Sequence, residues 1–429
     1  MATTDIFAPP RPQPLSERLA SCRSCASDDL ERVLDLGMQP IANALVEVDD
    51  VDSREARFPL ELMVCRSCSL CQVSETIPPT SLFGNDYPYF SSFIPALLEH
   101  SRAHVEALIA ERKLGPDDLI VEVASNDGYL LQAFRDADIP ILGIDPAKGP
   151  ADASAARGIP TLNAFFDAAL AEQLTADGTR ASVMIANNVL AHVSSINDFV
   201  SGFSILLADD GIAEFEFPYI VELLKRNAFD TIYHEHIFYY SLQALEPLFA
   251  RHGLHLNDAT PLEIHGGSLR IRVSHQPGQS MQLITLMNLE KTLRLNSLEP
   301  YIDFADRVNA IRDDLRSMLT DIVEGGGTIA AYGAAAKGAT LLNFVDLPSG
   351  IIKYVVDRNI HKVGKYMPGL MLPIRNVAEF EHSPTTHLLI LPWNFADEII
   401  SQQCAFAKAG GKFLVAIPKP QVVDVHFGR

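Results

Sequence analysis

The side chains best suited to proton transfer lie together in one short stretch. Tyr233, His234, Glu235 and His236 are consecutive, within the largely apolar sequence 232–240. An imidazole that is held by a carboxylate or a hydroxyl can accept and release protons near neutral pH. On a β-strand, by contrast, Tyr233 and Glu235 would face one way and the two histidines the other, and one pair would simply be solvated. The segment therefore predicts general acid–base catalysis, with a half-solvated strand as the alternative.

The N-terminal fifth of the chain has a cysteine pattern typical of metal binding. Five of the six cysteines lie within the first 71 residues, and two CRSC sequences, at 22–25 and 65–68, are separated by 39 residues. Two such pairs let four thiolates close a tetrahedron around Zn²⁺, which leaves no open position and makes the metal structural. Cys71 offers a competing second pair with Cys68, and reduced free cysteines are a further alternative. The repeated CRSC sequence favours a zinc site with the ligands Cys22, Cys25, Cys65 and Cys68.

The overall charge limits which partners the protein can have. The 429 residues include 34 Lys and Arg against 54 Asp and Glu, a formal net charge of −20. Such a chain repels polyanions, so nucleic acid is not expected as a partner. The sequence contains no run of about 18 apolar residues, and residues 1–13 lack the apolar core of a signal peptide. We therefore expect a cytoplasmic protein with no membrane partner and, from its length, about three domains.

The elements expected to position these side chains begin with a βα unit in the middle of the chain. Residues 119–124 predict a buried parallel strand, residues 125–128 a turn and residues 129–134 a helix, and a second strand ends at Asp145. In an open α/β sheet, ligands bind at the carboxyl ends of the strands, where an acid after the second strand can hold ribose hydroxyls. The glycine-rich dinucleotide fingerprint is absent from the turn. We expect a nucleoside-type ligand near Asp145, with a purely structural unit as the alternative.

Further strands are expected to bring other polar residues to the same edge. Asn187 and Asn188 follow one of these strands directly, and His192 is expected one turn into the next helix. The Tyr233–His236 segment comes after the next strand and a short helix, so it can overhang the same edge. The expected strands are at residues 182–186, 211–218, 254–263 and 269–273.

The last third of the chain predicts a second open α/β sheet. The sequence 325–338 combines a strand, a turn of small residues and a helix start, in which backbone amides and Lys337 can hold a phosphate. It is not a Walker A sequence, so an NTPase is not expected. We predict a nucleotide-binding sheet, with a scaffold domain as the alternative. A long amphipathic helix is expected at about residues 298–323, and further strands at 353–357, 388–394 and 412–418.

Taken together, these motifs resemble one family over nearly the whole chain. The sequence is similar to the nucleotide-sugar C-methyltransferases that add a methyl branch to carbon 3 of dTDP-4-keto-deoxysugars. The resemblance rests on the two CxxC pairs, 86–91 (DYPYFS), 121–130, 187–192, 233–236 (YHEH), 265–270 (HGGSLR), 333–338 (GAAAKG), 356–358 (VDR), 368–369 (PG) and 393–395 (WNF).

The resemblance implies an α/β fold in three parts and two cofactors. The parts are a zinc-binding domain at residues 1–80, a class I S-adenosylmethionine-dependent methyltransferase domain with a Rossmann-like fold at 81–276, and a second Rossmann-like domain that binds the nucleotide sugar at 277–429. The cofactors are S-adenosylmethionine and a structural zinc ion. The residues expected to bind S-adenosylmethionine are Glu122, Ser125, Asn126, Asp127, Gly128, Asp145, Asn187 and Asn188.

The implied reaction begins with removal of a proton from C3 of the sugar, next to the C4 ketone, and the resulting enolate attacks the sulfonium methyl group. His236 is the expected base and His192 its rival. Glu235 is expected to bind a sugar hydroxyl or to orient a histidine, while Tyr233, Tyr87 and His192 hydrogen-bond the ketone and enolate. The residues expected to bind the substrate are Tyr89, Phe90, Tyr332, Gly333, Ala334, Lys337, Asp357 and Trp393.

Two other functions are open at this point. A C-methyltransferase of the same fold could act on another small ketone or keto acid. A non-catalytic binding protein could retain the cofactor fold, although the presence of Asp127, Asp145, Tyr233 and His236 argues against that loss.

Overall fold

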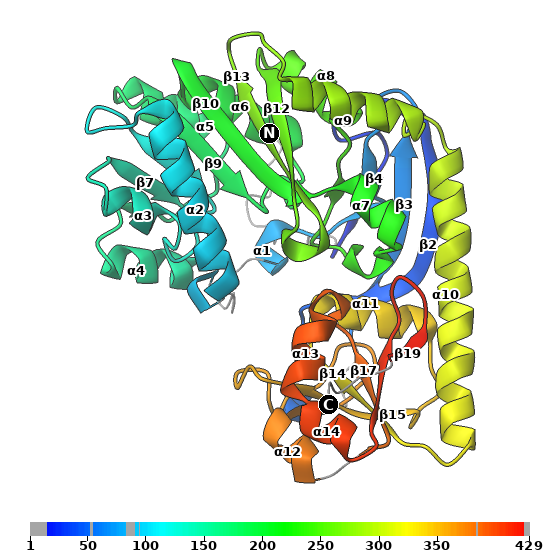
Figure 1. The fold of residues 1–429 in the computed structure, drawn as a ribbon. Helices are drawn as coiled ribbons and strands as arrows, with labels where there is room; N and C mark the ends of the chain where they lie inside the picture. The colour runs from blue at the N-terminus through cyan, green and yellow to red at the C-terminus, as the bar shows by residue number, and fades with distance from the viewer. Residues whose placement is uncertain (1–14, 52–54, 83–90, 94, 383–384, 424–429) are drawn as a thin grey trace, which may run out of the picture.

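The computed structural model describes residues 15–51, 55–82, 91–93, 95–382 and 385–423. In Figure 1, two open α/β sheets lie one above the other, and a smaller β-sheet near the N-terminus lies beside them. We call these the central sheet, the C-terminal sheet and the N-terminal module. The long helix α10 (Glu299–Glu324) runs along one side of the molecule, beside both sheets.

The central sheet has seven strands in the order β12-β13-β10-β9-β6-β7-β8. The strands from β10 to β8 are parallel, while β12 and β13 extend one edge as an antiparallel pair. Because the strand order reverses between β6 and β9, the carboxyl ends of these two strands mark the ligand-binding edge. The bounds are β6 Ile120–Val123, β7 Ile141–Ile144, β8 Thr161–Leu162, β9 Ala181–Asn187, β10 Leu207–Pro218, β12 His255–Leu262 and β13 Ser268–Ser274.

Helices cover both faces of this sheet, which explains why its parallel strands are largely buried. Residues 183–186 of β9 are fully buried, as expected for a strand covered on both sides. Ser241 caps α8, since its hydroxyl accepts a hydrogen bond from the backbone N–H of Ala244. The bounds are η2 Ser91–Phe93, α2 Pro95–Arg112, α3 Leu131–Arg135, α4 Lys148–Ala156, α5 Ala168–Ala176, α6 Ile196–Leu206, α7 Ile220–Arg226, η3 Phe229–Thr231, α8 Leu242–Arg251, η4 Ile264–Gly266 and α9 Met281–Thr292.

The N-terminal module contains a four-stranded antiparallel sheet whose edge strand comes from the middle of the chain. The order is β11-β4-β3-β2, and β11 (Phe238–Tyr239) pairs with β4. The segment that directly follows Tyr233–His236 is therefore a strand of this module. The other elements are β1 Glu17–Arg18, β2 Leu30–Pro40, η1 Val48–Asp50, β3 Arg57–Cys65, β4 Cys71–Val73, β5 Glu75–Thr76 and α1 Pro79–Leu82.

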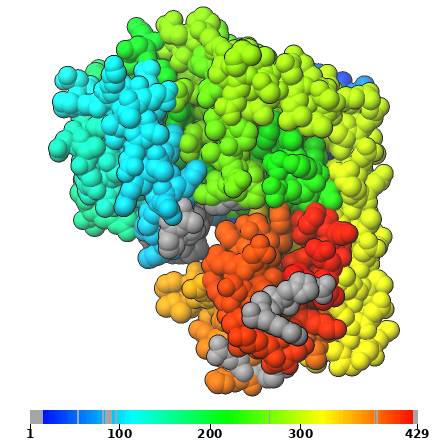
Figure 2. Space-filling view, viewed as in Figure 1, coloured from blue at the N-terminus to red at the C-terminus, as the bar shows by residue number. Residues whose placement is uncertain are grey.

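The C-terminal sheet has six strands in the order β16-β15-β14-β17-β18-β19, all parallel except β19. In the space-filling view, this unit lies directly against the central unit (Figure 2). Its elements are β14 Ile329–Tyr332, α11 Ala336–Val345, β15 Ile352–Asp357, β16 Ile374–Asn376, α12 Val377–His382, β17 His387–Ile390, η5 Trp393–Phe395, α13 Ala396–Gln402, α14 Cys404–Lys408, β18 Lys412–Val415 and β19 Gln421–Val423.

The predicted α/β class with two open sheets is confirmed, but one local expectation and one alternative are wrong. His192 does not lie in a helix, because Asn188 adopts a left-handed conformation with φ +57° and α6 begins only at Ile196. The Tyr233–His236 segment is not a strand but a turn, closed by a hydrogen bond from the N–H of His236 to the carbonyl oxygen of Tyr233 at 2.9 Å. Within the described ranges, no helix has both the length and the apolar composition that crossing a membrane requires.

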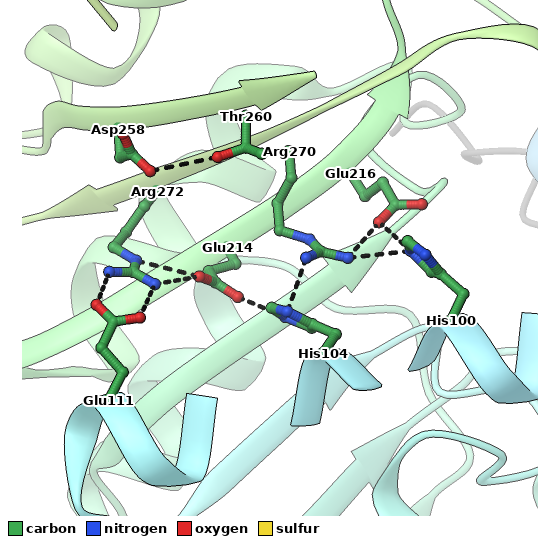
Figure 3. A network of polar contacts seen from close by, with 9 residues as sticks. All are labelled: His100, His104, Glu111, Glu214, Glu216, Asp258, Thr260, Arg270 and Arg272. Carbon is green, nitrogen blue, oxygen red and sulfur yellow. Dashed lines mark hydrogen bonds and ion pairs between the residues drawn. The ribbon is translucent and has the colours of Figure 1, made fainter. Parts of the chain in front are cut away.

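A buried charge network fixes α2 on the central sheet (Figure 3). On β10, Glu216 lies opposite Arg270 of β13 and accepts a hydrogen bond from its guanidinium at 2.8 Å. His100 of α2 approaches the same carboxylate at 3.1 Å. One turn further along α2, His104 lies 2.7 Å from the carboxylate of Glu214. The helix, two strands and two buried carboxylates thus form one connected structure.

The network keeps the Glu216 carboxyl ionised although it is buried. Burial raises its pKa, but the hydrogen bond of His100 and the charge of Arg270 outweigh this and hold the pKa below its ordinary value. A depressed folded-state pKa stabilises the fold above the unfolded pKa of about 4.3, and this stabilisation is lost as the pH falls through the folded value.

We predict that Arg270→Ala lowers the free energy of unfolding at pH 7 by about 3–5 kcal/mol, because it leaves Glu216 buried without its guanidinium partner. The difference from wild type should shrink as the pH is lowered to about 4, where Glu216 of the variant is protonated. Urea unfolding at both pH values measures this effect. Arg102→Ala, on the exposed side of α2, is the matched control, and equal stability of the two variants would contradict the prediction.

Candidate active site and zinc centre

Four cysteine sulfur atoms converge at one end of the N-terminal module. The Sγ atoms of Cys22, Cys25, Cys65 and Cys68 all lie within 4.8 Å of one another. The pairs Cys22–Cys68 and Cys25–Cys65 are both 3.6 Å apart. A tetrahedral zinc ion with Zn–S bonds of about 2.3 Å requires sulfur–sulfur distances of about 3.8 Å. The four thiols that the sequence favoured therefore fit a zinc ion.

Cys71 does not belong to this group. Its thiol lies on β4, fully buried, and burial raises its pKa, so that it stays protonated. The alternative pair of Cys68 and Cys71 is therefore disfavoured. The partner of Cys68 in the cluster is Cys65, from the same CRSC sequence, and not Cys71.

The zinc end of the module is attached to two helices of the central unit. The side-chain amide of Asn197 in α6 donates to the carbonyl oxygens of Arg23 and Ser24 at 2.8 and 2.9 Å. Arg251 of α8 donates to the same Ser24 carbonyl at 2.9 Å. Hydrogen bonds to backbone carbonyl oxygens thus hold the first CRSC sequence. These bonds fix the N-terminal module against the central unit.

The expected cofactor residues surround the carboxyl ends of β6 and β7. The Asp145 carboxylate, directly after β7, accepts hydrogen bonds from the backbone N–H groups of Asn126 and Ala147, both at 2.8 Å. Asp127 accepts from the hydroxyl of Ser92 at 2.5 Å and pairs with Arg157 at 3.2 Å. Asp145 thus fixes the turn after β6, and each of its oxygens retains a lone pair that can accept from a ribose hydroxyl.

Several buried polar atoms at this edge fit a polar ligand. Within the described part of the chain, four of them have no hydrogen-bond partner, although buried polar groups are nearly always paired. Gly128 has φ +76°, and a Cβ atom there would lie 2.3 Å from Ile159, so the turn tolerates no side chain at this position. Asn188, with its left-handed backbone, donates its N–H to the carbonyl oxygen of Glu216 at 2.6 Å. The unpartnered atoms are Glu122 Oε2, Ser125 Oγ, Asp127 Oδ1 and Asn187 Oδ1.

The turn at residues 233–236 places a hydroxyl against an imidazole. The Tyr233 hydroxyl lies 2.8 Å from Nε2 of His236, and the two rings are stacked with centroids 4.1 Å apart. Nδ1 of His236 lies 2.9 Å from the carbonyl oxygen of Thr231. Because a carbonyl oxygen can only accept, Nδ1 carries the proton in the neutral ring and Nε2 carries the lone pair. The basic nitrogen of His236 therefore faces Tyr233.

His192 lies beside this imidazole, with the ring centroids 4.8 Å apart in an edge-on arrangement. Burial lowers the pKa of His192 to about 4, although a hydrogen bond to the backbone of Glu235 opposes the effect. His192 is thus neutral at pH 7 and a much weaker base than an ordinary histidine.

The two remaining members of the segment contact the N-terminal module. His234 is buried, and its Nε2 donates to the carbonyl oxygen of Pro59 at 3.1 Å. Burial lowers the pKa of His234 to about 4. Glu235 is also buried, and its carboxylate accepts from the side-chain amide of Asn43 at 2.5 Å. Sequence reasoning did not identify Asn43, because nothing in residues 41–45 distinguishes it.

The C-terminal sheet contributes Trp393 and Lys337 close to the same segment. The indole N–H of Trp393 donates to the carboxylate of Asp230 at 2.9 Å, and the Lys337 ammonium lies 5.6 Å from the Trp393 ring centroid. Burial raises the pKa of Asp230 to about 6, opposed by the charge of Lys337 and the Trp393 hydrogen bond. Asp230 immediately precedes Thr231, whose carbonyl oxygen orients His236.

The loop after β14 repeats the construction seen after β6. The Asp357 carboxylate at the end of β15 accepts from the N–H of Ala334 at 2.7 Å, as Asp145 does from Asn126. Gly333 has φ +92°, and a Cβ atom there would lie 2.6 Å from Pro392. Tyr332 is buried at the end of β14, and its hydroxyl has no hydrogen-bond partner among the described residues.

The expected site residues thus form two groups that the segment 230–236 connects. The predicted cofactor residues lie at the ends of β6, β7 and β9, and the predicted substrate residues of the C-terminal sheet lie around the loop after β14. Tyr87, Tyr89 and Phe90 lie outside the described residues.

Comparisons with known proteins identify the family. Three family models match consecutive parts of the chain: a zinc binding domain at residues 22–83, a methyltransferase domain at 98–258 and a C-methyltransferase C-terminal domain at 263–418. The C-methyltransferase NovU of Streptomyces niveus is 35% identical over 419 residues, which cover 96% of this chain and 99% of NovU.

Solved methyltransferases match less than half of the chain. Magnesium protoporphyrin IX methyltransferase from Synechocystis, with bound S-adenosylmethionine, is 12% identical with a TM-score of 0.33, over 42% of this chain and 79% of its own. An S-adenosylmethionine-dependent methyltransferase from Clostridium acetobutylicum is 10% identical with a TM-score of 0.33, over 42% of this chain and 92% of its own.

We predict that the purified, reduced protein contains about one zinc ion per chain. Cys68→Ala should lose the metal, because it removes one of four converging thiolates. Cys71→Ala is the matched control and should keep the zinc, since Cys71 lies outside the cluster. Atomic emission analysis of the three proteins measures this, and zinc lost from Cys71→Ala but kept by Cys68→Ala would refute the ligand assignment.

Proposed function

Because the chain belongs to the family of S-adenosylmethionine-dependent C-methyltransferases, we propose that it methylates carbon 3 of a nucleotide-linked 4-keto-deoxysugar, with His236 as the base. The observation that carries this proposal is the geometry around His236, whose basic Nε2 lies 2.8 Å from the hydroxyl of Tyr233. The resemblance in the motifs and the second α/β sheet support a nucleotide sugar as the substrate.

The proposed substrate is a carbon acid. The C4 ketone acidifies the adjacent C3–H bond, and removal of that proton gives an enolate with its charge on the C4 oxygen. The enzyme therefore needs a base at C3 and a hydrogen-bond donor at the oxygen of the neighbouring carbon. S-adenosylmethionine, when bound at the ends of β6 and β7, supplies an electrophilic methyl group.

His236 and Tyr233 match these two requirements. Nε2 of His236 is the acceptor for the C3 proton, because Thr231 holds the Nδ1 proton on the opposite side of the ring. The Tyr233 hydroxyl, next to Nε2, is positioned to donate to the enolate oxygen when C3 approaches the base. The base and the donor lie close enough together to reach C3 and the oxygen on the neighbouring C4.

His192 suits the role of a neutral hydrogen-bond donor and not that of the base. A group whose pKa is lowered to about 4 drives proton removal from carbon poorly at pH 7. A neutral imidazole also avoids placing a second positive charge beside a sulfonium group.

The C-terminal sheet is the proposed site of the nucleoside diphosphate. Lys337 lies in the first turn of α11, where its ammonium and the helix N-terminus both favour phosphate. Trp393 and Asp230 connect this loop to the peptide that orients His236. A substrate held by its diphosphate at Lys337 can in this way extend its sugar toward the base. The zinc ion, enclosed by four thiolates, is assigned a structural role.

We predict that His236→Gln lowers turnover with a 4-keto nucleotide sugar about 10²–10⁴-fold, the usual contribution of a general base. The affinity for S-adenosylmethionine, measured by calorimetry, should stay within about twofold of wild type, because His236 lies in the turn after η3 and not at the ends of β6, β7 and β9, where the cofactor is expected. His255→Gln, on an exposed position of β12, is the control. Near-normal turnover by His236→Gln would eliminate His236 as the base.

We predict that a substrate with deuterium at C3 loses this label to solvent when the methyl group is added. Deuterium at C2, which is not adjacent to the ketone, should remain. Mass spectrometry of the two products distinguishes these outcomes. Product that retains the C3 deuterium would rule out an enolate formed by loss of the C3 proton, and methylation of a free ketone but of no nucleotide sugar would reassign the substrate.

A further inference from the structure

The carboxyl group of Glu235 has its hydrogen-bond donors in the N-terminal module. The side-chain amide of Asn43 donates to Oε2 at 2.5 Å, across 192 positions of sequence. The backbone N–H of Asn43 also contributes a hydrogen bond to this carboxyl group. Asn43 itself is exposed, whereas only 6% of Glu235 is accessible. One residue of the module thus supplies both amide groups to a buried carboxyl of the proposed active site.

The loop that carries Asn43 lies where three parts of the molecule meet. Three residues earlier in the sequence, β2 ends at Pro40, at the end of the hairpin opposite the cysteines. Val46 exchanges backbone hydrogen bonds with Tyr366 of the C-terminal unit, at 2.8 and 3.0 Å. Pro59, on the paired strand β3, binds His234. The far end of the β2–β3 hairpin is therefore packed against the catalytic turn and is also bound to the C-terminal unit.

Asn43 is the group that favours an ionised Glu235. Burial raises the pKa of Glu235 to about 7, and the two hydrogen bonds from Asn43 oppose this rise. Hydrogen bonds donated to a carboxylate stabilise its charged form. Without the side-chain donor, the pKa of Glu235 should rise further and the carboxyl should be largely protonated at pH 7.

The other groups around Glu235 do not provide a compensating charge. His192, which bonds to its backbone, and His234, its neighbour in the turn, are neutral at pH 7 because burial lowers the pKa of both to about 4. His236 and Tyr233 are hydrogen-bonded to each other. Among the described residues, no charged side chain contributes to the pKa of Glu235, and Asn43 is its only polar partner that is identified there.

We propose that Asn43 is a positioning residue of the active site, which holds the Glu235 carboxylate ionised and correctly oriented for the substrate, so that the N-terminal module forms part of the catalytic centre. This inference rests on the proposed function in one respect, namely that Glu235 takes part in the reaction. The role of Asn43 in the ionisation of Glu235 does not depend on the identity of the substrate.

The first test measures the titration of Glu235 without any substrate. Infrared difference titration of protein labelled with ¹³C in the glutamate carboxyl groups follows protonation, and the band missing in Glu235→Gln identifies Glu235. In Asn43→Ala the midpoint should move upward by about one pH unit, and in Asn43→Asp by more, because a second carboxylate repels the first. Asn43→Gln keeps an amide donor and should stay closer to wild type. Asn288→Ala, an exposed position of α9, is the matched control.

The second test measures the pH dependence of kcat/KM for methyl transfer by the same variants. Activity should fall on the acidic side as Glu235 becomes protonated, and in Asn43→Ala this limb should move upward together with the infrared midpoint. S-adenosylmethionine affinity should not change. In the Glu235→Gln background, Asn43→Ala should cause no further shift of the limb.

Each outcome decides one point. An infrared midpoint that does not move in Asn43→Ala overturns the inference. A midpoint that moves while the acidic limb stays in place overturns the positioning role. Normal turnover by Glu235→Gln removes Glu235 from the reaction, and with it the role of Asn43. If no 4-keto nucleotide sugar is methylated, the proposed function fails while the infrared result remains valid.

Discussion

The hydrogen bond between Nδ1 of His236 and the carbonyl oxygen of Thr231 is the interaction on which the proposed chemistry depends. It determines which ring nitrogen carries the lone pair, and it directs that lone pair toward Tyr233. The acceptor is a backbone atom, so its direction is set by the path of the chain and cannot be adjusted by a rotamer change. The orientation of the His236 ring therefore depends on how firmly the peptide at residues 230–231 is held in place.

That peptide is supported from two directions. Asp230 is bound by Trp393 of the C-terminal sheet, and the Tyr239 hydroxyl donates to the Thr231 carbonyl at 3.3 Å. Tyr239 lies on β11, which pairs with β4 of the N-terminal module. A position fixed by packing and by hydrogen bonds from rigid elements is more accurate than one on a free loop. The N-terminal module and the C-terminal sheet thus both contribute to the orientation of one imidazole.

Much of the architecture could be predicted from the sequence, because the signals are local. Apolar runs such as residues 119–124 and 353–357 indicate parallel strands, and the repeated CRSC sequence identified the four converging thiols. The turn at 233–236 was not predictable, since alternating apolar and polar residues also suit a strand. The sequence did not identify Asn43 and Asp230 for another reason. Their hydrogen-bond partners lie 192 and 163 positions away, and no local sequence pattern predicts such contacts.

The insertion of β11 into the sheet of the N-terminal module has a consequence for how the protein forms. During synthesis, β2, β3 and β4 leave the ribosome long before residues 238–239. The edge of β4 therefore stays unpaired until β11, about 165 residues later in the chain, has been made. Contacts of such long range slow folding and leave a strand edge exposed in the meantime. The N-terminal module is thus not an independent domain of continuous sequence. A chimaera in which the module comes from a relative would also need the catalytic turn and β11 of that relative.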